Sequence, residues 1–185
     1  MRSSSIGASG NIVVLTSFPP SLIRLNGGQR MEDYDRLCLQ SWIACGFHVM
    51  AVNTAEEISS LSLRYPEVEF VTAERTARSL FGRDTPFIAD MLTLLSERQE
   101  PVLGIINCDL LFEPDRFWAE LPDVIGSKTV VTGQRYDLRT LGGGVMNPYF
   151  PGFDYFFFDH RPPGHWRMRR SPSRWGCPGG ITGFR

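Results

Sequence analysis

Short apolar runs alternate with amphipathic segments along most of this chain. Apolar runs that predict strands cover residues 12–15, 47–52, 68–71, 102–107 and 130–131. Between them, apolar residues recur at helical spacing and predict helices over residues 31–45, 54–65, 85–95 and 113–121. Strands that alternate with helices in this way predict an α/β fold with a mostly parallel sheet and helices on both faces.

Capping and helix-breaking residues at the ends of these segments predict where the helices begin and end. Gly46 is placed to end the first helix. Thr54 with Glu57 three residues later is the capping-box pattern, and Pro66 ends that helix. The pair at residues 85–86, Thr-Pro, predicts an N-cap followed by proline at the first helical position, and Pro114 predicts the start of the last helix.

The run at residues 102–106 stops on two oxygen-bearing side chains, Asn107 and Asp109. In an open α/β sheet the ligand crevice lies beyond the carboxyl ends of the strands. Residues i and i+2 of a strand project to the same side, and Mg²⁺ or Mn²⁺ takes oxygen ligands together with substrate phosphates. The two residues therefore predict an anchor for a divalent metal and a diphosphate. The alternative is that Asn107 caps a turn and Asp109 opens the next loop.

Two further segments carry candidate chemistry. Thr16 and Ser17 follow the first strand at the same predicted edge, so their hydroxyls and backbone amides are candidates to bind a base or ribose, although such loops are often plain connectors. Asp154 stands among aromatic residues, where a charged group needs a partner. It is a candidate general base, acceptor-binding group or helix N-cap. The glycines at 142–144 lack the Lys-Ser/Thr ending of a phosphate-binding Walker loop.

Composition narrows the function classes. The chain has 185 residues, a formal net charge of −1, 42% hydrophobic and 21% charged residues, which fits one globular domain and argues against a generally nucleic-acid-binding surface. Four cysteines without a C-x-x-C pair and only three histidines argue against a zinc site. The apolar run at 12–15 is too short for a signal sequence or a membrane span, so we expect a soluble, cytoplasmic protein.

Taken together, these motifs resemble bacterial glycosyltransferase-like proteins of the GT-A type over residues 11–158. The motifs that carry the resemblance are T-S-F-P-P at 16–20, Q-S-W at 40–42, G-F at 46–47, Asn53, G-I-I-N-C-D at 104–109 and G-F-D-Y-F-F at 152–157. The resemblance implies a Rossmann-like GT-A sheet in which a D-x-D motif binds a divalent metal and the diphosphate of a nucleotide sugar. Here Asn107 replaces the first Asp, which keeps an oxygen ligand and removes one negative charge. The resemblance also puts Asp154 where such enzymes place acceptor-site or catalytic carboxylates.

The character of the chain changes at residue 160. Residues 160–185 contain six arginines, no lysine, no acid and almost no aliphatic residue. One interpretation is a basic arm for nucleic acid or another acidic partner. The other is translation out of frame, because codons can be chosen for residues 172–185 whose shifted frame encodes an aromatic, core-like string. In that case the domain is incomplete or truncated, its apolar surface is exposed and its activity is doubtful.

The sequence thus predicts a disordered N-terminus (1–10), a nucleotide-sugar-binding domain (11–159) and a disordered basic tail (160–185). The expected function is metal-assisted transfer of a sugar from a nucleotide-diphosphate sugar to an unknown acceptor. Asn107 and Asp109 would hold Mn²⁺ or Mg²⁺, Thr16 and Ser17 would contact the nucleotide, and Asp154 would serve as base or acceptor contact. The alternatives are a remnant or binding module without turnover, or a nucleic-acid-associated protein that acts through the tail, although no nucleic-acid partner is expected.

Overall fold

The computed structural model describes residues 11–20, 24–26, 29–31, 33–126, 129–138, 140, 145–148, 152–159 and 182–183. The expected disordered N-terminus lies outside these residues, as does the expected tail apart from Thr182–Gly183. The glycines at 142–144 also lie outside them.

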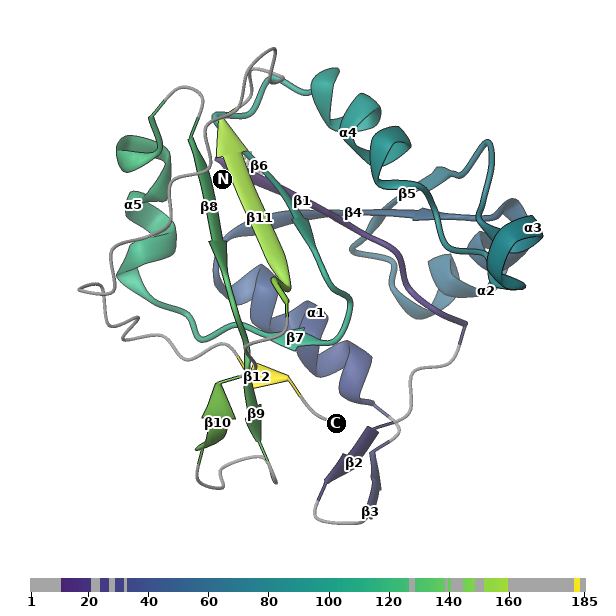
Figure 1. The fold of residues 1–185 in the computed structure, drawn as a ribbon, viewed down its shortest axis with the longest axis horizontal. Helices are drawn as coiled ribbons and strands as arrows, with labels where there is room; N and C mark the ends of the chain where they lie inside the picture. The colour runs from purple at the N-terminus through teal and green to yellow at the C-terminus, as the bar shows by residue number, and fades with distance from the viewer. Residues whose placement is uncertain are drawn as a thin grey trace, which may run out of the picture.

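A six-stranded sheet forms the centre of the fold, in the order β5-β4-β1-β6-β11-β8 (Figure 1). Its strands are β1 (Ile12–Thr16), β4 (Phe47–Asn53), β5 (Glu69–Thr72), β6 (Val102–Ile106), β8 (Val130–Gly133) and β11 (Tyr155–Asp159). Strand β1 is parallel to β4 and β6, and β4 is parallel to β5. Strand β11 is antiparallel to both β6 and β8, so it is the one reversed strand of a mostly parallel sheet. This confirms the predicted fold class.

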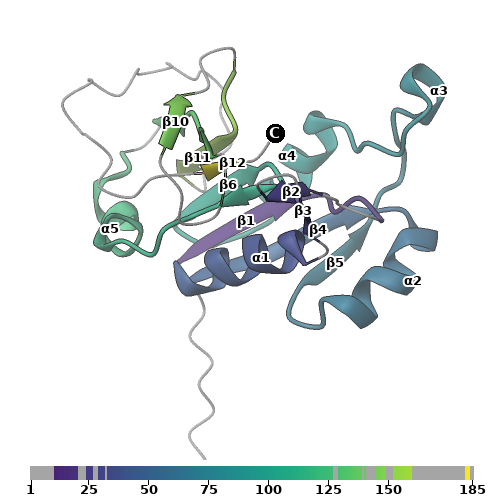
Figure 2. The ribbon, with the colours of Figure 1, turned by 90° about the horizontal axis from the view of Figure 1, so that it is seen from below.

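Helices pack on both faces of the sheet, as predicted. The helices are α1 (Tyr34–Ala44), α2 (Ala55–Arg64), α3 (Arg78–Phe81), α4 (Ile88–Ser96) and α5 (Arg116–Val124). Figure 2 shows α1 and α2 on one side of the sheet and α4 on the other. The buried residues divide in the same way, because one hydrophobic cluster contains side chains of α1, α2 and α5, and the second contains those of α4.

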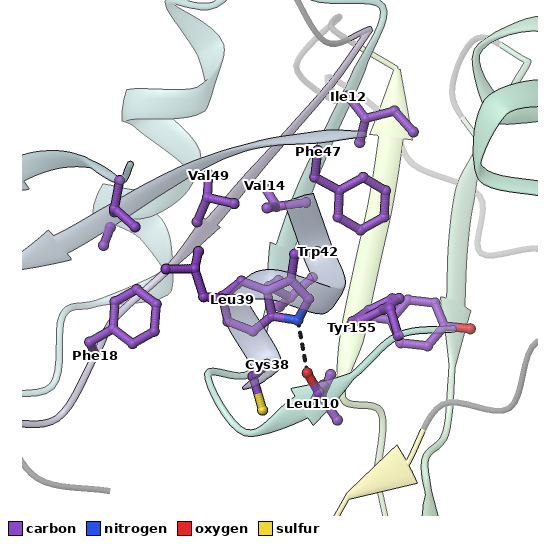
Figure 3. Packing of buried hydrophobic residues seen from close by; sticks show 14 of the residues in the cluster. Ile12, Val14, Phe18, Cys38, Leu39, Trp42, Phe47, Val49, Leu110 and Tyr155 are labelled. Atoms are coloured by element: carbon purple, nitrogen blue, oxygen red, sulfur yellow. Dashed lines mark hydrogen bonds between the residues drawn. The ribbon is translucent and has the colours of Figure 1, made fainter. Parts of the chain in front are cut away.

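The larger cluster holds the aromatic core. Trp42 of α1 is fully buried, and its indole Nε1 donates a hydrogen bond of 2.8 Å to the carbonyl oxygen of Leu110 (Figure 3). Phe47 at the start of β4 packs at 5.6 Å, between ring centroids, on Phe157 of β11. Tyr155 and Phe157 of β11 belong to this cluster, and Phe158 belongs to the second one, so β11 supplies aromatic core side chains to both faces of the sheet.

Smaller pieces of sheet complete the described structure. A four-stranded sheet has the order β10-β9-β12-β7, and β2 (Arg24–Asn26) pairs with β3 (Gln29–Met31). The members of the four-stranded sheet are β7 (Leu110–Leu111), β9 (Tyr136–Leu138), β10 (Val145–Pro148) and β12 (Thr182–Gly183). Strand β12 pairs with β7 and β9. No helix in the described parts of the chain is long and apolar enough to cross a membrane.

The starts of three helices differ from the prediction. Helix α1 begins at Tyr34 and not at residue 31, because Met31 belongs to β3. Helix α4 begins at Ile88 without a side-chain cap, because the predicted cap at residues 85–86 serves a β-bridge: Pro86 pairs with Thr76, and the Thr85 carbonyl accepts a hydrogen bond from Ala77. Ile88, one of the apolar residues at helical spacing in the predicted helix 85–95, is 58% exposed.

Helix α5 begins later than Pro114 predicts. Its N-cap is Asp115, whose carboxylate accepts a hydrogen bond of 2.8 Å from the backbone N–H of Phe117. Such a side-chain acceptor satisfies an otherwise unpaired N–H of the first turn. The residue that caps α5 is therefore Asp115, which directly follows Pro114.

Candidate functional site at the carboxyl edge of the sheet

Three of the predicted site segments meet at the carboxyl edge of the sheet. In the parallel ladders Thr16 is opposite Ala51, and Leu15 is opposite Ile105, so β1 and β6 end level with each other, and β4 continues for two more residues to Asn53. Strand β11 runs the other way and starts with Tyr155 opposite Ile106. Asp154 therefore arrives beside Asn107, which directly follows β6.

Thr16 forms an internal link at this edge. Its side chain is 1% exposed, and its hydroxyl donates a hydrogen bond of 2.9 Å to the carbonyl oxygen of Ile106. The hydroxyl thus connects the ends of β1 and β6. Ser17, the next residue, is half-buried. The Thr16 hydroxyl is buried and already donates its hydrogen bond to Ile106. The remaining candidates in this loop for the predicted nucleotide contact are therefore its backbone groups and Ser17.

Asn53, the last residue of β4, fixes the same loop. Its side-chain oxygen accepts a hydrogen bond of 3.2 Å from the backbone N–H of Phe18, and its amide donates to the Phe18 carbonyl oxygen at 2.7 Å. The amide also donates to Glu57 at 3.0 Å, in the first turn of α2. We did not single out Asn53 as a site residue, although a polar residue that ends an apolar strand is the signal that pointed to Asn107.

Asn107 and Asp154 are joined twice. The Asn107 side-chain amide donates to Oδ1 of Asp154 at 3.0 Å, and the backbone N–H of Asn107 donates to the Asp154 carbonyl oxygen at 3.0 Å. The suggestion that Asp154 caps a helix is wrong, because it immediately precedes β11. Asp154 is 4% exposed, whereas Asn107 is exposed.

Arg135 is the charged partner that buried Asp154 requires. Its Nη1 lies 2.5 Å from Oδ1 of Asp154, its backbone N–H donates to Oδ2 at 3.2 Å, and its Nε donates to Asp137 at 3.0 Å. Burial alone would lower the pKa of the Arg135 guanidinium, but the hydrogen bond to Asp137 and the charge of Asp154 outweigh burial and raise it. Arg135 was not predicted as a site residue, although a buried carboxylate calls for a cation and Arg135 closely follows a predicted strand.

Asp109 lies in a turn between β6 and β7. The strand ends at Ile106, so the alternation of side chains along a strand does not set the direction of Asp109, and that step of the sequence argument is wrong. A residue of α1 stabilises this turn, because the Tyr34 hydroxyl donates a hydrogen bond of 2.9 Å to the Asp109 carbonyl oxygen. The Asp109 side chain is half-buried.

The residues of the edge supply hard oxygen donors. Asp109 has a carboxylate, and Asn107 keeps its side-chain oxygen as an acceptor because its amide nitrogen is bonded to Asp154. These donors suit Mg²⁺ or Mn²⁺. Within the described ranges, no group of three or more His, Cys, Asp or Glu residues is placed to hold a metal ion. Any cation at this edge would therefore need donors from its ligand, as diphosphate oxygens would provide.

The cysteine thiols near the core are poor nucleophiles. Burial raises the pKa of Cys38 far above its ordinary value, and burial raises the pKa of Cys45 to about 12. Because the thiolate is the reactive form, both groups stay unreactive at neutral pH.

Comparison with known proteins gives only distant structural matches. No family model and no curated protein matches the chain. Among solved structures, HddC from Yersinia pseudotuberculosis in complex with GMP-PN is 11% identical with a TM-score of 0.44, and the match covers 94% of this chain and 89% of that one. A nucleotidyl transferase from Methanothermobacter thermautotrophicus is 11% identical with a TM-score of 0.43, over 80% of this chain and 71% of that one. At this level of similarity the matches assign no function.

Proposed function

We propose that this chain binds a nucleotide-diphosphate sugar at the carboxyl edge of its sheet and transfers the sugar to an acceptor. The observation that carries the proposal is the position of Asn107 and Asp109 directly after β6, a central strand of the sheet, where the ends of β1 and β4 and the start of β11 also meet. Ligands of open α/β sheets bind outside these strand ends. The motif resemblance to GT-A glycosyltransferase-like proteins supports the same location.

Each residue has a stated role in this proposal. Asp109, helped by the side-chain oxygen of Asn107, would hold Mn²⁺ or Mg²⁺ together with the diphosphate. A bound cation of this kind neutralises charge that develops on a leaving diphosphate. Ser17 and the backbone of Thr16 would contact the nucleotide, because the Asn53 side chain holds the following residue, Phe18, in a fixed position.

Calorimetric titration with a panel of nucleotide sugars in the presence of Mn²⁺ tests the proposal. We expect wild type to bind at least one member and Asp109→Ala to bind it at least about tenfold more weakly, which is about 1.4 kcal/mol. Asp123→Ala, an acid-to-alanine change at an exposed position of α5, is the matched control and should bind like wild type. Equal binding by Asp109→Ala and wild type would remove Asp109 from the metal site.

A binding module without turnover is the second candidate, and the surroundings of Asp154 favour it. Both carboxylate oxygens of Asp154 accept hydrogen bonds from Asn107 or Arg135. A general base must instead reach the proton that it removes. Release of free nucleoside diphosphate from a bound nucleotide sugar, measured with and without candidate acceptors, separates the two functions. Binding without any release would support the module.

A further inference from the structure

We infer that Asp154 and Arg135 are positioning residues that fix the Asn107 amide, and that this contact explains why an asparagine occupies the first position of the N-x-D motif. The inference rests on the proposed function for the part that concerns the ligand. It assigns Asp154 a role different from the base or acceptor contact suggested by the sequence.

The orientation of the Asn107 amide follows from hydrogen-bond chemistry. An ionised carboxylate only accepts hydrogen bonds, whereas the two ends of an amide differ, one donating and one accepting. The amide nitrogen must therefore face Asp154, as observed at 3.0 Å. The amide oxygen takes no part in this contact, and because Asn107 is exposed it stays available to a cation or another ligand donor. The backbone hydrogen bond between the same two residues adds a second constraint.

Aspartate at position 107 would not fit this contact. Its carboxylate would meet that of Asp154 at about 3 Å, where like charges repel strongly in a partly buried setting. Arg135 already binds two carboxylates, those of Asp154 and Asp137. It cannot pair equally well with a third. The loss of one negative charge relative to a D-x-D motif is thus the consequence of a neighbouring carboxylate.

Arg135 also determines what Asp154 can do. The guanidinium side chain is 14% exposed and that of Asp154 is 4% exposed, so the ion pair is largely shielded from water. A charge-assisted hydrogen bond in such a place is stronger than one on the surface. It holds Asp154 as a fixed, charged acceptor for Asn107. Arg135 precedes β9 and binds Asp137 within it, so the same side chain ties the four-stranded sheet to the carboxyl edge.

A double-mutant cycle on unfolding tests the contact without any ligand. We compare the urea midpoints of wild type, Asn107→Asp, Asp154→Asn and the double variant at pH 7. Asn107→Asp should lower the midpoint, and the double variant should have a higher midpoint than Asn107→Asp because an amide again faces a carboxylate. Gln40→Glu makes the same amide-to-acid change at an exposed position of α1 and should leave the midpoint unchanged. An unchanged midpoint for Asn107→Asp, or no rescue in the double variant, would overturn the inference.

Binding of Mn²⁺ with UDP or GDP tests the positioning role separately. Asp154→Asn should weaken binding by about 10- to 100-fold, as loss of an outer partner of a metal ligand does. Leu95→Ala is the control for a general loss of stability, because Leu95 lies in the hydrophobic cluster on the other face of the sheet from α1. It should be less stable than wild type but bind Mn²⁺ and the nucleotide with the same affinity. If Asp154→Asn binds like wild type, the positioning role is wrong even where the unfolding cycle succeeds. If wild type binds neither nucleotide nor nucleotide sugar, the proposed function fails, and the cycle still decides the contact.

Discussion

Gly104 in the middle of β6 shows how tightly single residues are specified near the site. A Cβ atom at this position would lie 2.7 Å from two ring atoms of Phe157, which is fully buried. Glycine is needed here for the close approach of the aromatic ring. The same ring packs the core beneath the strand that leads to Asn107.

Gly104→Ala should therefore destabilise the protein by about 1–3 kcal/mol, the usual cost of an overpacked core. Urea unfolding measures the loss. Gly126→Ala is the control, because among the residues that the structure describes a Cβ there would meet only the Thr129 hydroxyl, at 3.4 Å. A Gly104→Ala variant as stable as wild type would show that the ring of Phe157 can shift.

The buried hydroxyl of Thr16 provides a second prediction at this scale. Thr16→Val keeps the shape and removes the donor to the Ile106 carbonyl oxygen, so we expect a loss of about 1–3 kcal/mol in the free energy of unfolding. Thr16→Ser retains a hydroxyl and should lose less. A larger loss in Thr16→Ser than in Thr16→Val would mean that the methyl group, and not the hydrogen bond, matters.

At the residue scale, the sequence predicted single candidate site residues but not the residues that they contact. Asn107 and Asp154 stood out because a polar residue ends an apolar strand and a carboxylate interrupts an aromatic run. They are 47 positions apart, and their contact depends on the pairing of β11 with β6. Arg135 reaches Asp154 through a second pairing, that of β11 with β8, which ends at Gly133. No local pattern contains this information.

At the scale of elements, local signals worked where the residues interact with their own neighbours. The Thr54–Glu57 capping box forms as predicted, with both of its hydrogen bonds present. Gly46 ends α1 with a φ of 83°, which favours glycine. The prediction failed at residues 85–86 because a tertiary bridge to Thr76 competes for them.

The connection between β5 and α4 is held by exposed ion pairs, which makes it sensitive to acid. Hydrogen bonds from Arg78 and Thr76 lower the pKa of Asp84 from 3.8 to about 2, and a hydrogen bond from Arg75 lowers the pKa of Asp90. Because these pKa values are depressed in the folded state, their stabilisation is present above the unfolded value and is lost as the pH falls from about 4 towards 2.

We therefore expect residues 73–87 to lose protection from hydrogen exchange, corrected for intrinsic rates, between pH 5 and pH 2, before the sheet does. Asp84→Asn should show the weaker protection already at pH 6, since it cannot form the ion pair with Arg78. Constant protection across this pH range would show that the ion pairs do not hold the connection.

At the scale of the whole molecule, one sheet carries both hydrophobic clusters. Alternate residues of β1 point to opposite faces: Ile12 and Val14 belong to the larger cluster, and Val13 and Leu15 belong to the cluster that α4 covers. Because the two clusters share the same strands, we expect them to unfold together in a single transition.

Leu95→Ala tests this coupling. Leu95 is fully buried in the cluster of α4, while Trp42 and Trp118 lie in the other cluster. The substitution should cost about 2–5 kcal/mol and move the tryptophan fluorescence midpoint as far as the midpoint followed by circular dichroism. Two separate midpoints would show that the faces of the sheet unfold independently.

The sequence by itself determined the α/β class, most element positions and the candidate residues, because these depend on periodicity and on contacts within a few residues along the chain. Only the tertiary structure decided that β11 is antiparallel, that Thr16 is used internally and that Arg135 holds Asp154 against Asn107. These features depend on which strands pair and in which direction. Strand pairing is fixed by burial summed over the whole sheet, and no short stretch of sequence encodes it.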